Sequence, residues 1–321
     1  MLAIMKNSIN TDLIIIGAGP AGLTAGIYGG RALLPTVILE QGLPGGQLNE
    51  TDFIENFPGF PEKIAGPELM KRTRSQAERL GAKIIMDTVT GIEPLGDGYH
   101  IHGTQTEYGA RAVIIASGSH PRELPVDGAK ELKGKGVSYC ATCDGFFFQG
   151  KRIIEVGAGD SGLTEAIFLT RFADSVQIVV RHPQDDPNAL RASSSILKKR
   201  AEENEKISFL WNTVVEKVLG KDRVTGVLLR DLGTGETEQL EIDGIFVNIG
   251  HIPDTEFLRG DVELDKRGYI ITDDRLRTNL PGVFAAGDVR AGASRYAQAI
   301  VAAADGAIAA MEVENYLAGQ R

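Results

Sequence analysis

Hydrophobic and polar positions follow the same order in two blocks of the chain. Residues 13–16 are four consecutive apolar residues, and residues 153–156 repeat this run except at Glu155. Each run leads through Gly-Ala-Gly, with a third glycine three residues later, into sequence rich in Ala, Leu and Ile at helical spacing. A short apolar run followed by helical periodicity predicts a strand, a turn and a helix. The chain therefore contains this strand–turn–helix unit twice.

Further periodic segments extend both blocks. Residues 35–39 and residues 176–180 each predict one more strand. The Ala-rich, amphipathic tail over residues 299–317 predicts a helix that packs on the first block. Strands that alternate with helices are typical of parallel sheets. We expect an α/β fold with two Rossmann-like dinucleotide-binding domains of the three-layer type.

Glu155 is the exception in the apolar run of the second block. A buried carboxylate without a partner is costly. This side chain must therefore be paired, protonated or displaced toward the edge of the sheet. Its position alone indicates no function.

Length and composition limit the class of protein. The 321 residues are 42% hydrophobic and 24% charged, which suits a soluble globular chain with two domains. The formal net charge of −9 disfavours nucleic acids and anionic membranes as partners. No apolar run approaches the roughly 18 residues of a membrane helix, and residues 1–10 lack the apolar region of a signal peptide. We expect a cytoplasmic protein.

The two glycine-rich turns predict dinucleotide sites. The first glycine of such a turn permits a tight bend, the second lets backbone approach a pyrophosphate, and the third lets the helix pack on the strand. The N-terminus of the helix then faces the phosphates. One such motif alone is weak evidence, but two in matched contexts are far stronger. The alternative for each is a turn used only for packing.

The residues that follow the second strand differ between the blocks. In the first block this residue is Glu40, whose carboxylate can accept hydrogen bonds from both ribose hydroxyls of an adenosine. That favours FAD or NAD over a 2′-phosphorylated cofactor. In the second block Arg181 and His182 follow, and basic side chains there could meet a 2′-phosphate. We expect the two sites to hold different ligands.

The two cysteines, Cys140 and Cys143, are separated by two residues and precede the second block. This spacing lets one thiolate attack a substrate disulfide while the other resolves the mixed disulfide. The adjacent Asp144 could move the proton, although an aspartate before glycine also commonly forms a turn or a cap. A structural zinc site needs four ligands, and the five histidines are scattered along the chain. We predict redox chemistry at the cysteines and no metal site.

Taken together, these motifs resemble the low-molecular-weight thioredoxin reductases, which are FAD-dependent pyridine nucleotide-disulfide oxidoreductases. The resemblance spans nearly the whole chain. It rests on the two dinucleotide motifs, on Cys140-Ala141-Thr142-Cys143-Asp144-Gly145, and on residues 45–48 (GGQL), 55–59 (ENFPG), 116–118 (ASG), 250–253 (GHIP) and 283–288 (VFAAGD).

The resemblance implies a discontinuous FAD domain formed by residues 1–122 and 249–321. Residues 123–248 would form an inserted pyridine-nucleotide domain that carries the cysteines. It also implies a homodimer, and a rotation of the inserted domain between catalytic steps.

The same resemblance implies the activity of a disulfide oxidoreductase. Electrons would pass from a nicotinamide through FAD to the dithiol, and then to a thioredoxin-like protein. Cys143 would lie nearer the flavin, Cys140 would be the interchange thiol, and Asp144 would be the acid.

Binding residues carried over from the family fall into two sets. Asp288 would bind the ribityl chain of FAD, and Gln298 would face its pyrimidine edge. The full FAD set is Gly17, Gly19, Pro20, Ala21, Glu40, Gln41, Gly46, Gln47, Leu48, Asn56, Ala116, Ser117, Gly118, Gly287, Asp288, Gln298 and Ala299. The second dinucleotide would contact Gly157, Gly159, Asp160, Ser161, Arg181, His182 and Arg191.

The second site departs from the family pattern. Members that use NADPH have paired arginines and a third arginine soon after, whereas here Arg181 precedes a histidine and Arg191 follows a longer segment with Asp185 and Asp186. These carboxylates would repel a 2′-phosphate, or accept from a free 2′-hydroxyl as in NADH sites. A solvated loop that points away from the site is the other interpretation.

Two further departures concern small residues. Gly162 stands where the family usually has alanine, and the segment 296–300 has an alanine where arginine is usual. The donor therefore stays open between NADPH, NADH and ferredoxin, and the inserted domain could also hold a second flavin. A redox sensor that binds FAD without catalysis is the alternative from another class.

Overall fold

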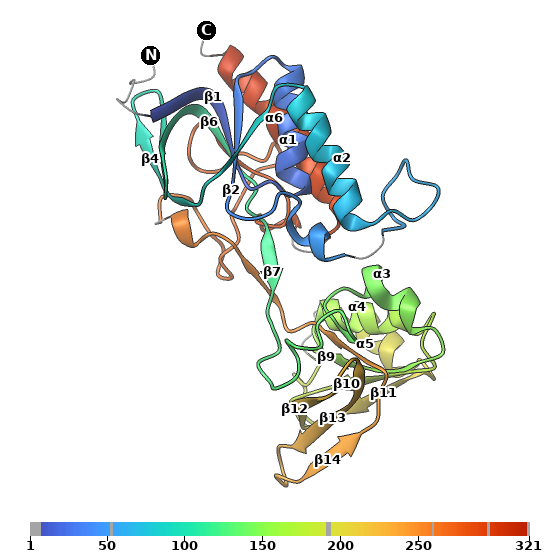
Figure 1. Cartoon of the computed structure of the whole chain (residues 1–321). Helices are drawn as coiled ribbons and strands as arrows, with labels where there is room; N and C mark the ends of the chain where they lie inside the picture. Colours follow the sequence, from blue (N-terminus) through green and yellow to red (C-terminus); the bar gives the residue numbers. More distant parts are fainter. Residues whose placement is uncertain (1–7, 52–53, 191–193, 259, 294–295, 320–321) are drawn as a thin grey trace. The chain divides into compact units, whose positions relative to one another are not determined.

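The computed structural model in Figure 1 describes residues 8–51, 54–190, 194–258, 260–293 and 296–319. It divides into two compact units. Unit 1 consists of Met1–His120 and Ile252–Arg321, and unit 2 of Pro121–His251. Unit 2 is thus inserted into the sequence of unit 1.

A seven-stranded sheet forms the centre of unit 1. Its strands lie in the order β3-β2-β1-β6-β5-β4, and β17 pairs with β6. The five strands β1, β2, β3, β6 and β17 pair in parallel, whereas β4, β5 and β6 form an antiparallel meander. The bounds are β1 Ser8–Ile16, β2 Thr36–Glu40, β3 Lys83–Met86, β4 Val89–Leu95, β5 Gly98–Gly103, β6 Glu107–Ile115 and β17 Val283–Ala285.

Alternation along β1 explains its unbroken apolar run. Leu13 and Ile15 are buried in one core with helices α1 (Pro20–Arg31), α2 (Gly66–Arg79) and α6 (Ala299–Ala318), which gather on one face of the parallel strands (Figure 1). Ile14 and Ile16 are buried in a second core, with β4 and β5. A strand covered on both faces needs apolar residues at every position. The predicted C-terminal helix is confirmed as α6.

Unit 2 repeats this plan. A five-stranded parallel sheet has the order β11-β10-β9-β15-β8, and β12, β13 and β14 form a separate antiparallel sheet. Ile153 of β9 is buried in a core with α4, and Ile154 in a core with β12 and β13. The bounds are β8 Val137–Ser138, α3 Ala141–Asp144, β9 Arg152–Val156, α4 Asp160–Leu169, β10 Ser175–Val179, α5 Ser195–Glu202, β11 Ile207–Leu210, β12 Thr213–Gly220, β13 Val224–Asp231, β14 Thr237–Leu240 and β15 Gly244–Val247.

The chain crosses between the units twice, through β7 (Ser119–Pro121) and β16 (His251–Pro253), which pair as a two-stranded sheet. Three short 3-10 helices complete the described elements: η1 (Gly46–Glu50), η2 (Gly145–Phe148) and η3 (Glu256–Leu258). Within the described ranges, no helix combines the length and apolar character needed to span a membrane. The expected α/β fold with two Rossmann-like units is confirmed.

Candidate functional site

Two glycines of the turn between β1 and α1 lie too close to neighbouring backbone atoms to carry a side chain. Gly17 has a φ of +100°, and a Cβ on it would lie 2.4 Å from the Ala116 oxygen. A Cβ on Gly22 would lie 1.8 Å from the Gly17 oxygen. Gly19 instead has room around it, since the atom nearest to its added Cβ, the Cα of Gly46, is 4.0 Å away. The turn thus leaves room where a pyrophosphate would meet the N-terminus of α1.

Glu40 ends β2 beside this turn. Its Oε2 accepts a 2.7 Å hydrogen bond from the Ala18 amide, and its Oε1 accepts a 2.8 Å bond from the Gly42 amide. A carboxylate has further lone pairs, so it can still accept from ribose hydroxyls. A pocket of about 90 Å³ lies here, lined by Ile16, Gly17, Glu40, Gln41, Asp87, Val89, Ser117, Asp254 and Phe257.

The loop after β2 folds over the same turn. The Gly45 amide donates to the Ala18 oxygen at 2.8 Å, and a Cβ on Gly46 would lie 3.2 Å from the Cα of Gly19. Gln47 Nε2 donates to the backbone oxygen of Ser119, and Leu48 packs against the helix-side core of unit 1. Gly45 and Gly46 therefore lie beside the start of α1, and Gln47 lies beside Ser119.

Gly287 and Asp288 reach the start of α1 from the far end of the sequence. A Cβ on Gly287 would lie 2.9 Å from the Cβ of Ala21. The Gly287 amide donates to Asp305, which also accepts two hydrogen bonds from Arg290, at 2.6 and 2.9 Å. Burial, followed by the nearby Asp305, raises the pKa of Asp288 to about 6. A carboxyl group in this setting suits hydrogen bonding to polyol hydroxyls.

Of the remaining expected FAD residues, Ala116 and Ser117 directly follow β6 at the end of the sheet, and Asn56 contacts Gln298. The Ala116 amide donates to the Ile16 oxygen at 2.8 Å, and Ser117 Oγ donates to the Asp254 oxygen at 2.7 Å. Asn56 Nδ2 donates to Gln298 Oε1 at 3.0 Å, although the two are 242 residues apart. Gln298 is the N-cap residue of α6, which Ala299 begins. The residues of this cradle fit a dinucleotide such as FAD.

Cys140 and Cys143 form a disulfide in unit 2, with their Cα atoms 5.3 Å apart. Cys140 is the N-cap residue of α3, and both cysteines are partly exposed. The Cys140 amide donates to Ser138 Oγ at 3.2 Å, and Cys140 Sγ lies 3.3 Å from Thr142 Oγ1. The pair is therefore held on a short, partly accessible turn, where a thiolate of the reduced pair can reach the disulfide of a partner.

Asp144 takes part in the turn that holds the cysteines, and its carboxylate lies next to Ser138. Its amide donates to the Cys140 oxygen at 3.1 Å, which closes the short turn of α3. Its Oδ2 accepts a 2.6 Å hydrogen bond from Ser138 Oγ, the same hydroxyl that accepts from the Cys140 amide. One serine hydroxyl thus links the carboxylate to the backbone of the first cysteine.

Glu155 is fully buried and paired. Asn248 Nδ2 donates to Glu155 Oε1 at 2.8 Å and to Glu165 Oε2 at 2.7 Å, while Glu165 Oε2 also accepts from the Ala141 amide at 3.0 Å. Burial, followed by the nearby Glu165, raises the pKa of Glu155 well above its ordinary value of 4.5. Burial is also the main cause that raises the pKa of Glu165. The carboxylate is therefore paired and biased toward protonation rather than displaced to an edge.

Glu165, Asn248 and Ser138 are candidate site residues that the sequence interpretation missed. Asn248 directly follows the apolar strand β15, and side chains at the carboxyl ends of parallel strands commonly line sites. That position was a usable signal. Glu165 lies within an ordinary helical pattern, so its contact with the cysteine turn has no counterpart in the sequence.

The second glycine turn has the same construction as the first. A Cβ on Gly157 would lie 2.2 Å from the Asn248 oxygen, and a Cβ on Gly162 would lie 2.1 Å from the Gly157 oxygen. Gly159 has open space around it. Asp160 begins α4, and its Oδ1 accepts from the Ser194 amide at 3.2 Å; the neighbouring Ser161 is exposed. The turn therefore has room for a second dinucleotide.

The basic position after β10 is paired with an acid. His182 Nδ1 lies 3.0 Å from Asp186 Oδ2, so the segment after the strand makes a local turn that brings this carboxylate to the imidazole. Arg181 and Asp185 are exposed. Arg191 lies outside the described residues. A carboxylate at this distance opposes a 2′-phosphate beside His182.

Comparison with known proteins agrees with the geometry. Residues 11–306 match the family model for pyridine nucleotide-disulphide oxidoreductases. Thioredoxin reductases of Streptomyces clavuligerus and Mycolicibacterium smegmatis are 46% and 47% identical to the chain, and the alignments cover 96% of this chain and 94% and 97% of theirs. The crystal structure of thioredoxin reductase from Streptococcus pyogenes superposes with a TM-score of 0.87 at 42% identity, covering 97% of this chain and 99% of that chain.

Proposed function

Since the chain belongs to the thioredoxin reductases of the pyridine nucleotide-disulphide oxidoreductase family, we propose that it uses FAD and a pyridine nucleotide to reduce the disulfide of a thioredoxin-like protein. The observation that carries this proposal is the partly exposed Cys140–Cys143 disulfide, which shares unit 2 with the second dinucleotide turn. FAD would be held by the unit 1 cradle around Gly19, Glu40 and Asp288, and it would supply an electron pair to the disulfide.

The cysteines would then reduce the partner by thiol–disulfide exchange. Two electrons and two protons convert the disulfide to two thiols. The Cys140 thiolate attacks one sulfur of the partner disulfide and forms a mixed disulfide, and the Cys143 thiolate displaces the partner as a dithiol. Asp144 would act as the acid, and its hydrogen bond from Ser138 Oγ, which accepts from the Cys140 amide, supports this role by holding the carboxyl group near the cysteine turn.

Serine substitutions test the proposal. Cys140→Ser and Cys143→Ser should each abolish steady-state reduction of a thioredoxin disulfide, because neither exchange step can finish. Both variants should keep their flavin absorbance, since the FAD cradle lies in unit 1. Ser208→Ala, at an exposed position of β11, serves as the control. Full turnover by Cys143→Ser would refute the mechanism.

A second candidate differs only in the electron donor. The pairing of His182 with Asp186 supports NADH over NADPH, because a carboxylate beside His182 would repel a 2′-phosphate bound there. Anaerobic addition of NADH, NADPH and reduced ferredoxin in separate runs, followed by flavin absorbance, distinguishes the donors. Faster bleaching by NADH is the expected result. Bleaching by ferredoxin alone would exclude both nucleotides.

Two further properties follow from family membership as proposals. The chain would form a homodimer, which light scattering after gel filtration would test. Unit 2 would rotate about the crossing segments β7 and β16 between catalytic steps.

A redox sensor that binds FAD without catalysis is the remaining alternative. Multiple turnovers with any electron donor and a protein disulfide would exclude it.

A further inference from the structure

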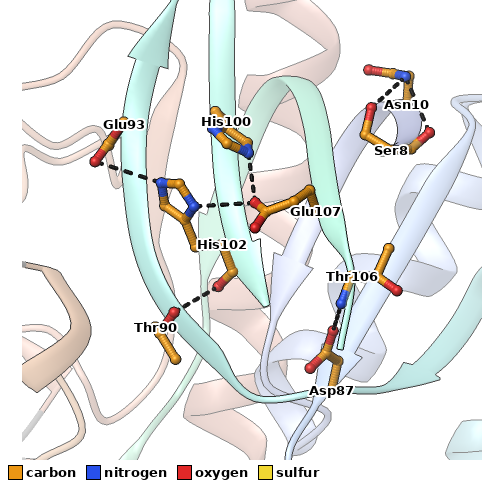
Figure 2. A network of polar contacts seen from close by, with 9 residues as sticks. All are labelled: Ser8, Asn10, Asp87, Thr90, Glu93, His100, His102, Thr106 and Glu107. Atoms are coloured by element: carbon orange, nitrogen blue, oxygen red, sulfur yellow. Dashed lines mark hydrogen bonds and ion pairs between the residues drawn. The ribbon is translucent and has the colours of Figure 1, made fainter. Parts of the chain in front are cut away.

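The antiparallel meander of unit 1 carries four metal-ligating side chains on one face (Figure 2). Glu93 of β4 lies opposite His100 of β5, and His102 of β5 lies opposite Glu107 of β6. His100 and His102 are two residues apart on a strand, so their side chains share a face. Ile101 between them is buried in the core on the other face. Two of the five histidines that are scattered in the sequence therefore meet two carboxylates here.

Glu107 contacts both imidazoles through one oxygen. Its Oε2 lies 2.6 Å from His100 Nε2 and 3.1 Å from His102 Nδ1. The ring centroids are 4.1 Å apart, with 55° between the planes. A neutral imidazole that donates to a carboxylate from one nitrogen has its lone pair on the other. This arrangement leaves His100 Nδ1 and His102 Nε2 as ligand atoms, and metal-bound histidines ordinarily donate their second N–H in this way.

The distance between His102 Nε2 and Glu93 suits two ligands of one metal ion. His102 Nε2 is buried and has no hydrogen-bond partner in the part of the chain that is described, and Glu93 Oε1 lies 3.5 Å from it. That is long for a hydrogen bond. It is close to the separation of about 3.3 Å between two ligands that each lie about 2.0–2.1 Å from a tetrahedral Zn²⁺. One carboxylate oxygen of Glu93 and one ring nitrogen each of His100 and His102 all lie within 4.8 Å of one another.

We propose that Glu93, His100 and His102 bind Zn²⁺, and that Glu107 orients both imidazoles. Two imidazoles and one carboxylate suit zinc better than magnesium or calcium, which prefer oxygen ligands alone. Three protein ligands leave the fourth position to water. Because β4 is the edge strand of the sheet, the ion joins this edge to β5 and stabilises the meander. The site is independent of the proposed redox chemistry.

Calorimetric titration with Zn²⁺ tests the site. The protein is used without an affinity tag, treated with a chelator and kept oxidised, so that Cys140 and Cys143 stay in their disulfide and do not bind the ion. The parent should bind one equivalent of Zn²⁺ and show a higher unfolding temperature with the ion. Co²⁺ in its place should give the visible absorption bands of a four-coordinate ion.

Variants decide whether these residues hold the ion. His102→Gln should lose the bound equivalent and the temperature shift. The side chain of Glu93 is half-exposed, so Glu93→Gln should fold like the parent. This variant should weaken binding as well. Glu107→Gln should lower the affinity by about 10- to 100-fold, the usual effect of removing an outer partner of a ligand.

His120→Gln is the matched control, because His120 forms an exposed pair with Asp254 and contacts none of the proposed ligands. It should bind Zn²⁺ like the parent. The proposal would be overturned if the parent did not bind Zn²⁺ stoichiometrically. It would also be overturned if Glu93→Gln and His102→Gln both bound Zn²⁺ as tightly as the parent.

Discussion

The buried carboxyl group of Glu155 makes the stability of unit 2 depend on pH. Its pKa is raised above the ordinary value, so the folded state binds this proton more tightly than the unfolded state. The favourable contribution is complete below pH 4.5, the ordinary pKa of the group in the unfolded chain, and is lost as the pH rises toward the folded pKa. Stability should therefore fall from mildly acidic to alkaline pH.

Glu155→Gln should remove this dependence, since a carboxamide has the shape of the protonated carboxyl and can still accept from Asn248. We expect it to unfold at higher denaturant concentration at pH 8, with a gain of about 1–3 kcal/mol, and to match the parent near pH 4.5. Glu203→Gln, at the exposed end of α5, is the control. Parallel pH profiles for Glu155→Gln and its parent would contradict the assignment.

Asp186 is the residue for which we expect an effect on donor preference. Asp186→Asn removes a negative charge beside His182, so kcat/KM for NADPH should rise about 5- to 10-fold, as expected for roughly 1 kcal/mol of repulsion. The value for NADH should stay nearly constant. Asp185→Asn makes the same charge change at an exposed neighbouring position and should have a smaller effect. Equal effects on both nucleotides would show that Asp186 does not face a 2′-phosphate.

At the scale of single residues, the candidate site residues could be predicted from the sequence better than the contacts that these residues make. Cys140, Cys143 and the glycine turns could be recognised because fixed spacings carry their chemistry. The pairing of His182 with Asp186 depends on the path of a loop, and the contact from Glu165 to the Ala141 amide depends on how α4 packs against α3. Neither leaves a periodic pattern in the sequence.

At the scale of elements, the third glycine of the first turn sets the distance between α1 and β1. Gly22→Ala should distort this turn, because the added Cβ would meet the Gly17 oxygen at 1.8 Å. We expect a loss of bound flavin and about 1–3 kcal/mol of unit 1 stability. Flavin content after purification and denaturant unfolding measure the two effects.

Gly319→Ala is the control for that substitution, because its Cβ would have ordinary contacts at 3.6 Å. It should keep its flavin. If Gly22→Ala bound flavin as well as this control, the close approach would not constrain the turn.

The elements themselves were largely predictable, but their lateral pairing was not. Apolar runs predicted β1, β2, β9 and β10, because each is covered on both faces. The meander residues Glu93 and His100 carry no such signal. They become neighbours only through the register of β4 on β5, and a shift by one residue would place them on opposite faces.

At the scale of the molecule, each unit has its own pair of cores. Those of unit 1 contain residues from both ends of the chain, and those of unit 2 only residues from the insert. We expect two transitions in scanning calorimetry. Removal of FAD should lower the transition of unit 1, because a bound ligand stabilises the unit that holds it.

The variant Glu155→Gln identifies the calorimetric transition of unit 2. Because Glu155 lies in unit 2, the substitution should shift the unfolding temperature of that transition only. A single transition that shifts as a whole in both experiments would mean that the units unfold together.

The order in which the chain is synthesised has a consequence for how the protein is made. Strand β17 pairs with β6, and α6 packs in the same core as α1, so the sheet and the helix-covered core of unit 1 are completed only by segments that follow unit 2 in the sequence. Unit 2 is fully translated by His251. Although domains commonly fold from the N-terminus onward during synthesis, the inserted unit of this chain is ready to fold first. Unit 1 must wait, with its apolar strands exposed to chaperones, until β17 and α6 have been translated.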